Sequence, residues 1–282
     1  MKKITFFAIL LAAVSSCTQK IDLKLDDSQS RLVVDATIAP SANSIKLTRS
    51  SGYFSNEPSP RVVNASVNIS DGSRNFQCLE TRAGESGIYL PDSSFHPVPG
   101  KTYTLDVQLA EAVAGKSSFT SSCTMAKVVK LDSITTDFIS DFQGVDTWEI
   151  KAFAQDPPEE GNCYLFQYYR NDTLISDSIF KYSIQEDRYF NGNYVNGAPV
   201  FYIDDSLPWE TLHPGDKVTV RMSGITREYY DFIMQVQQAG FNIPFYSGPP
   251  ANVKGNIDYG AIGFFTVYSS SWATTVVGDR RK

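Results

Sequence analysis

Side chains that commonly carry catalysis are sparse in this sequence. The two histidines, His96 and His213, each precede a proline, which indicates turn positions. The acid pairs Asp26-Asp27, Glu159-Glu160 and Asp204-Asp205 are each adjacent along the chain. Neighbouring residues of a strand point to opposite faces, so adjacency is not the arrangement of a glycosidase pair. The sequence therefore predicts no catalytic residue, no metal site, no cofactor and no enzymatic activity.

One cysteine occupies a position with a distinct chemistry. The chain opens with two lysines and an apolar run, Ile4–Val14, which is too short to cross a bilayer as a helix of about 20 residues. Two serines and Cys17 follow, and small residues directly before a cysteine are typical of a bacterial lipobox. A plain signal peptide with a chance cysteine is the alternative. We expect residues 1–16 to be a lipoprotein signal peptide, Cys17 to carry the lipid, and residues 17–30 to form the anchor and tether.

Length and charge restrict the partners. Cleavage before Cys17 leaves 266 of the 282 residues, enough for one large or two ordinary domains. The loss of two lysines changes the formal net charge from −6 to −8. An acidic chain argues against nucleic acid as a partner, because phosphate binding needs a basic surface. We expect contact with the outer membrane through the acylated cysteine, since no later segment is apolar for long enough to cross a bilayer.

The other three cysteines, Cys78, Cys123 and Cys163, show neither a CxxC nor a zinc spacing. An oxidising compartment permits one disulfide, for which Cys78 and Cys123 are the first candidates. The alternative is that all three are small buried hydrophobic residues in strands. We favour this second interpretation.

From Leu32 onward the apolar residues recur with a period of two. Short runs rich in β-branched and aromatic residues alternate with turn signals such as Asp71-Gly72 and Pro99-Gly100. We therefore predict an all-β protein of two sandwich-like units, at residues 31–126 and 127–282. The first is expected to be immunoglobulin-like or prealbumin-like. The second is expected to hold one amphipathic helix at about residues 226–239.

Aromatic residues gather between residues 180 and 209. Exposed rings there could stack on sugars or contact a protein partner, whereas buried rings would form a sandwich core. The sequence leaves both alternatives open. Our candidate residues for a partner contact are Tyr194, Phe201, Tyr202, Asp204, Asp205 and Trp209.

A loop in this region has the composition of a calcium site. Asp187, Asn191 and Asn193 offer oxygen ligands at nearby positions, but the EF-hand order and a closing glutamate are missing. A turn rich in asparagine and glycine explains the same residues, and we favour the turn.

Several stretches together resemble the domain-of-unknown-function family 4249, lipoproteins of the Bacteroidota. The resemblance covers nearly the whole mature chain in order. The stretches that carry it are IDLKLD, LVVDATI, ASVNISDG, VPGKTYTLDV, LDSI, QDPPEEGNCYLFQYYRND, PGDKVTV, TREYYDFIMQVQQ and PPANVKGNIDYGAIGFFTVYS.

The resemblance implies a context and no catalytic residues. Such lipoproteins are often encoded beside SusC-like TonB-dependent receptors, so we expect a non-enzymatic, lipid-anchored accessory of such a receptor in nutrient uptake. A free-standing structural, adhesive or carbohydrate-binding surface lipoprotein is the alternative, and no particular small-molecule or glycan ligand is indicated. Surface lipoproteins of this phylum often carry acidic residues after the cysteine. Here the acidic residues Asp22, Asp26 and Asp27 are present but come later in the tether. They therefore favour the cell surface over the periplasmic side only slightly.

Overall fold

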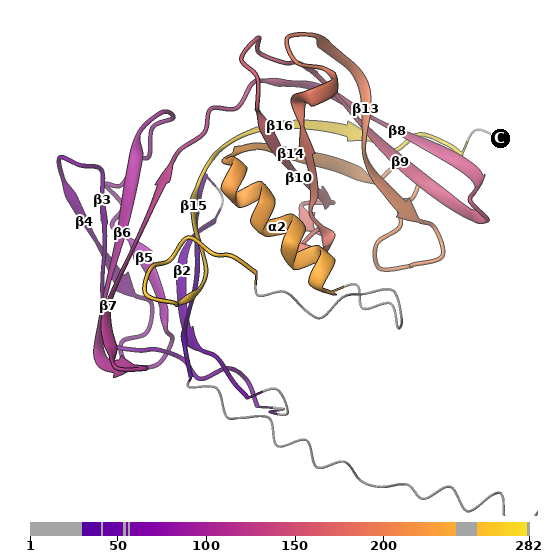
Figure 1. Cartoon of the computed structure of the whole chain (residues 1–282). Helices are drawn as coiled ribbons and strands as arrows, with labels where there is room; N and C mark the ends of the chain where they lie inside the picture. Colours follow the sequence, from indigo (N-terminus) through magenta and orange to yellow (C-terminus); the bar gives the residue numbers. More distant parts are fainter. Residues whose placement is uncertain (1–29, 41, 53–54, 56, 241–252, 281–282) are drawn as a thin grey trace, which may run out of the picture.

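The computed structural model describes residues 30–40, 42–52, 55, 57–240 and 253–280. In this part of the chain the secondary structure is almost entirely β, with one α-helix (Figure 1). The predicted all-β fold with sandwich-like units is confirmed. The described helix is too short and too polar to cross a membrane.

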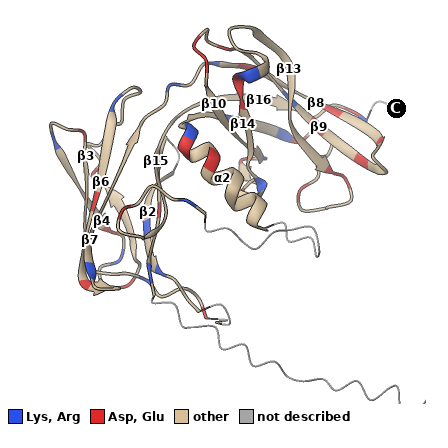
Figure 2. Ribbon diagram, in the orientation of Figure 1, with Lys and Arg blue, Asp and Glu red and all other residues tan. Residues whose placement is uncertain are grey.

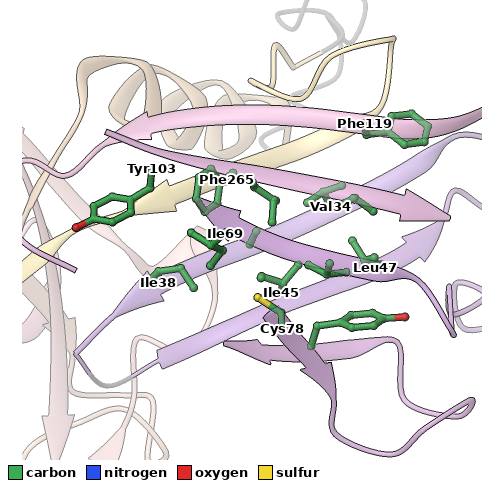
Figure 3. Packing of buried hydrophobic residues seen from close by; sticks show 14 of the residues in the cluster. Val34, Ile38, Ile45, Leu47, Ile69, Cys78, Tyr103, Phe119 and Phe265 are labelled. Carbon is green, nitrogen blue, oxygen red and sulfur yellow. The ribbon is translucent and has the colours of Figure 1, made fainter. Parts of the chain in front are cut away.

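The first unit is built on an eight-stranded sheet in the order β15-β1-β2-β5-β4-β3-β6-β7. Its strands are β1 (Leu32–Ala39), β2 (Ala42–Arg49), β3 (Ser66–Ser70), β4 (Asn75–Glu80), β5 (Ile88–Pro91), β6 (Thr102–Val113), β7 (Lys116–Thr124) and β15 (Ile262–Val267). Alternate side chains of these strands point to one side and form a single apolar core (Figure 3). The two ends of the sheet approach each other, since Ala126 forms a parallel bridge with Tyr268. The sheet therefore wraps around its own core.

The strand β15 comes from the far end of the sequence. It pairs in parallel with β1 from Val33↔Ile262 to Ile38↔Val267. The predicted boundary between residues 126 and 127 therefore does not separate the two units, because a segment from the C-terminal part completes the first sheet. A parallel pair needs a crossover connection, and here it comprises everything from β2 to α2, including all strands of the second unit except β16.

The second unit is a sandwich of a three-stranded sheet, β13-β9-β8, and a five-stranded sheet in which β11, β10, β14 and β16 follow one another and β12 also pairs with β10. The strands are β8 (Leu131–Phe142), β9 (Val145–Gln155), β10 (Cys163–Arg170), β11 (Thr173–Leu174), β12 (Ser183–Glu186), β13 (Tyr194–Asp204), β14 (Lys217–Ile225) and β16 (Ser269–Val276). Two short 3-10 helices, η1 (Ile179–Lys181) and η2 (Asp187–Tyr189), lie in the connections. The two sheets bury one apolar core around Trp148 and Ile150 of β9.

The helix α2 (Arg227–Gly240) confirms the predicted amphipathic helix. Thr226 caps it, because the Tyr229 amide donates to the Thr226 hydroxyl over 3.3 Å. Its buried face contacts both units: Tyr229 lies 5.0 Å from the Phe264 ring of β15, and the same cluster contains Leu165 of β10. The helix therefore forms part of the joint between the units.

The three described cysteines are free and buried. Cys78 lies on β4 and Cys123 on β7, and two other strands separate these in the sheet order. The candidate disulfide is not formed. The interpretation of these residues as small buried hydrophobic side chains is confirmed.

A glycine fixes the connection between the units. The segment 125–130 leaves β7 and crosses the strand β14 at Gly224. A Cβ atom on Gly224 would overlap the carbonyl oxygen of Lys127. Only glycine lets the two backbones approach this closely.

We predict that Gly224→Ala destabilises the protein by about 2 kcal/mol or more, because the backbone of the connection must move away from β14. Urea unfolding followed by circular dichroism measures this change. Gly278→Ala is the matched control, since a Cβ atom there meets nothing within 4 Å. Equal stability of the two variants would contradict the close approach.

Candidate functional site

The predicted contact segment follows the strand β13 and is not a single patch. Tyr194 and Tyr202 are both about half exposed, at 50% and 51%. Tyr194 pairs with Gln155, the last residue of β9, and Tyr202 pairs with Glu149, near the middle of β9. Six residues of β9 at about 3.3 Å each separate the two positions by roughly 20 Å. The two tyrosines therefore do not contact each other.

Phe201 belongs to the core, which corrects its prediction as a contact residue. Its ring lies 4.8 Å from that of Tyr168, and only 9% of the residue is exposed. The pairing with β9 shifts between Pro199 and Phe201, which is the signature of a bulge. The bulge lets Val200 and Phe201 both be buried although they are neighbours.

Asp205 is also a structural residue. Its Oδ1 accepts hydrogen bonds from Trp148 Nε1 at 3.2 Å, Thr211 Oγ1 at 2.7 Å and Arg280 at 2.9 Å. Its side chain is 15% exposed. The expectation that it presents its charge to a partner is therefore corrected. Asp204 is different, since within the described part of the chain its carboxylate accepts hydrogen bonds from Ser206 alone, whose amide lies at 2.7 Å, at the start of a turn.

Exposed apolar side chains gather at the end of the second unit that carries the β8–β9 turn. Tyr202 stacks on Phe142 with ring centres 4.9 Å apart and an angle of 7° between the planes. Val145 begins β9 directly after the turn and is 38% exposed. The loop after β13 begins beside this turn, because the Asp205 amide donates to the carbonyl of Asp146. We call Phe142, Val145 and Tyr202 the hairpin patch. Trp209 lies further along that loop, where its carbonyl accepts from Arg170 of β10 at 3.1 Å.

Charged groups flank the stacked rings. The carboxylate of Glu149, 7% exposed, lies 2.8 Å from the ammonium of Lys151, which also approaches Asp137 at 3.2 Å. Partial burial and a hydrogen bond with Glu149 raise the pKa of Tyr202. The patch therefore combines ring faces with hydrogen-bonding groups that are held in place. Tyr189, 89% exposed, and Tyr194 lie outside this patch.

A groove of about 510 Å³ lies at the opposite end of the second unit. The connection 126–129, the loop 157–162, the start of β10 and the start of α2 line it. Cys163 lies at its base and is buried, and burial raises the pKa of its thiol despite the nearby guanidinium of Arg227. A protonated thiol is a weak nucleophile, so Cys163 is not poised for covalent chemistry.

The charges at the start of α2 are mostly neutralised within the protein. Arg227 forms an ion pair with Glu186 and a longer one, 3.7 Å, with Asp231. In Figure 2 the ribbon of α2 begins with the blue of a basic residue and continues with the red of acidic residues. Lys127, on the opposite side of the groove, has no ion pair among the described residues.

The loop whose composition resembles a calcium site is a structural turn. Asp187 accepts the amides of Gly161 at 3.1 Å and Asn162 at 2.9 Å. Asp156 accepts the Tyr164 hydroxyl at 2.6 Å and the Gly192 amide at 3.1 Å, and burial raises its pKa. Both carboxylates thus hold the loop 157–162 against the segment after η2. No cluster of three or more histidine, cysteine, aspartate or glutamate side chains suited to a metal occurs in the described residues.

Sequence reasoning did not identify Asp156 and Tyr164 as partners. The available signal was an aspartate at the end of a predicted strand, directly before two prolines.

His96 and His213 lie outside strands and helices, as predicted. The imidazole of His213 faces Asp216 at 3.5 Å and is exposed. Cys17 lies outside the described residues.

The fold and these surfaces define a class of protein: an all-β chain of two sandwich-like units, joined through a shared strand path and one helix. Within that class, residues 18–273 match the family model described as Domain of unknown function (DUF4249), so the chain belongs to this family. The resemblance drawn from the sequence is confirmed. No curated protein matches the chain.

We predict that Asp205→Ala lowers the free energy of unfolding by about 2–3 kcal/mol, because it leaves the buried indole N–H of Trp148 and the Thr211 hydroxyl without their acceptor. Asp204→Ala, which removes one exposed turn contact, is the control and should cost about 1 kcal/mol or less. Guanidinium unfolding followed by tryptophan fluorescence compares the two. A larger loss for Asp204→Ala would show that the network around Asp205 contributes little.

Proposed function

We propose that this protein is a non-enzymatic, lipid-anchored accessory of the outer membrane that partners a SusC-like TonB-dependent receptor in nutrient uptake. The observation that carries the proposal is the hairpin patch. Tyr202 in this patch and Trp209 in the loop that starts beside it remain exposed, although the fold has apolar cores that could bury such rings. Aromatic residues are enriched where proteins contact each other, because they supply contact area at a small cost in entropy.

Lipid anchoring explains how a small contact surface could be enough to keep a membrane partner bound. Two or three acyl chains on Cys17 hold a protein at a membrane, whereas one chain binds only marginally. The tether 17–30 limits the distance of the first unit from the lipid to about 45 Å. Confinement to this layer raises the effective concentration of any membrane neighbour, so a weak contact persists.

A second candidate function is carbohydrate binding at the cell surface. The observation in its favour is the stack of Tyr202 on Phe142 beside the Glu149–Lys151 ion pair. An exposed ring face next to fixed hydrogen-bonding groups suits the apolar face and the hydroxyl groups of a sugar. The receptor partnership and this function use the same patch, so the identity of the captured ligand distinguishes them.

We predict that Cys17→Ser releases the protein from the membrane fraction, because the hydroxyl cannot form the thioether to the lipid. Fractionation of cells, with mass spectrometry of the mature N-terminus, measures this. The wild-type N-terminus should be an acylated Cys17. A variant that still sediments with outer membranes, together with a wild-type N-terminus at another residue, would overturn the anchor.

We also predict that purification of the tagged protein in mild detergent recovers a large TonB-dependent barrel. Tyr202→Ala combined with Trp209→Ala should reduce this recovery severalfold, since the first ring is exposed in the hairpin patch and the second in the loop that starts beside it. Tyr189→Ala is the control, because Tyr189 is the more exposed ring but lies at the other end of the unit. If crosslinked cells yield the lipoprotein alone, the receptor partnership is wrong.

A further inference from the structure

The groove at the start of α2 lies where the paired strands β8 and β9 separate. β8 and β9 are paired as far as Leu131↔Ala154, and beyond this pair the two chains separate. On one side, the connection before β8 is held against Gly224. On the other, the loop after β9 is drawn away, because the Asp156 amide donates to the carbonyl of Asn193 at 3.0 Å. The groove fills the space between them.

One wall of this groove has unpaired backbone. The segment Lys127–Lys130 runs between β7 and β8 without a helix or turn. Within the part of the chain that the structure describes, its amide and carbonyl groups form no hydrogen bond. Its neighbours are paired: the Ala126 carbonyl accepts from Ser269 at 2.8 Å, and the Leu131 amide donates to Ser271 at 2.8 Å. The Lys127 carbonyl faces β14 at Gly224, so the groups of the other residues in this segment are the ones left for another strand.

The opposite wall cannot satisfy these groups. Pro157 has no amide hydrogen, and its carbonyl already accepts from Gly192 at 3.1 Å. The carbonyl of Glu159 accepts from the Asn162 side chain. An added strand would therefore pair with the connection alone and present its other edge to the loop.

Charge around the groove favours an acidic occupant. Lys127 has no carboxylate partner among the described residues, and Lys130 has only a 3.6 Å contact with Asp132 while its own side chain is 83% exposed. Glu159 on the opposite wall is the one carboxylate among the groove-lining residues that the structure describes. A strand seated beside the connection would lie next to the lysines.

We propose that this groove binds an extended peptide segment of a partner protein, which pairs as a strand with Lys127–Lys130 and places an acidic side chain beside Lys127. Addition of a strand to an unpaired backbone is an established mode of peptide recognition: the main chain supplies affinity, and neighbouring side chains supply specificity. A volume of about 510 Å³ is within the range of ligand sites. The proposal does not depend on the identity of the partner at the hairpin patch.

The test uses the full mature chain in mild detergent and a fluorescent peptide of alternating glutamate and valine as the probe. Fluorescence polarisation measures binding, and hydrogen–deuterium exchange mass spectrometry locates it. Bound probe should slow amide exchange in the segment 127–130. Lys127→Glu should weaken binding about tenfold, whereas Lys116→Glu, on the distant hairpin that opens β7, should leave it unchanged.

A second probe distinguishes strand pairing from simple charge attraction. The same peptide with alternate backbone nitrogens methylated keeps its charge but cannot form the ladder, so its binding should be lost. Equal binding of the methylated probe would overturn the proposal, as would protection of amides elsewhere in the chain. Failure of the unmodified probe to bind at millimolar concentration would also overturn it, and none of these outcomes affects recovery of a receptor through the hairpin patch.

Discussion

The arrangement of the molecule depends on one strand path that belongs to both units. β15 ends at Val267 in the first sheet and β16 begins at Ser269 in the second, so Tyr268 alone separates them. Tyr268 is buried, and its amide donates to the carbonyl of Ile38 in β1 at 3.0 Å. A connection of one buried residue leaves no slack, unlike the exposed polar linkers that usually separate mobile domains. The position of one unit therefore restricts that of the other.

The helix α2 reinforces this joint by packing rather than by chain connection. Tyr229 and Phe232 both lie 5.0 Å from the ring of Phe264 in the first unit's sheet. Ile233 is fully buried in a cluster that also contains Leu165 of the second unit. Aromatic contacts of this kind contribute beyond the area they bury. The groove at the start of α2 thus lies beside the packed joint between the two units.

Local sequence patterns predicted the strands and the helix. They could not predict the features that depend on pairing between distant segments. The alternation in β1 and the amphipathic stripe of α2 are properties of neighbouring residues, which a sequence displays directly. The parallel pairing of β15 with β1 joins segments more than 200 residues apart, and periodicity carries no such information. The register shift at Phe201 depends on the facing strand, so strict alternation could not show that two successive residues are buried. Asp204 and Asp205 are chemically equal in sequence, and only the fold brings Trp148, Thr211 and Arg280 to one of them.

The two candidate surfaces lie at the two ends of one strand, and this separation has a functional consequence. β9 begins beside the hairpin patch at Val145 and ends beside the groove at Gln155. At about 3.3 Å per residue, Val145 lies roughly 33 Å from the last residue of β9, whereas Tyr202, which pairs with Glu149, lies roughly 20 Å from it. The sandwich core around Trp148 and Ile150 fills the space between, and close-packed cores do not deform continuously. A molecule seated on the turn side of the hairpin patch would leave the groove accessible, whereas one that also covered the strand beyond Tyr202 would approach the groove.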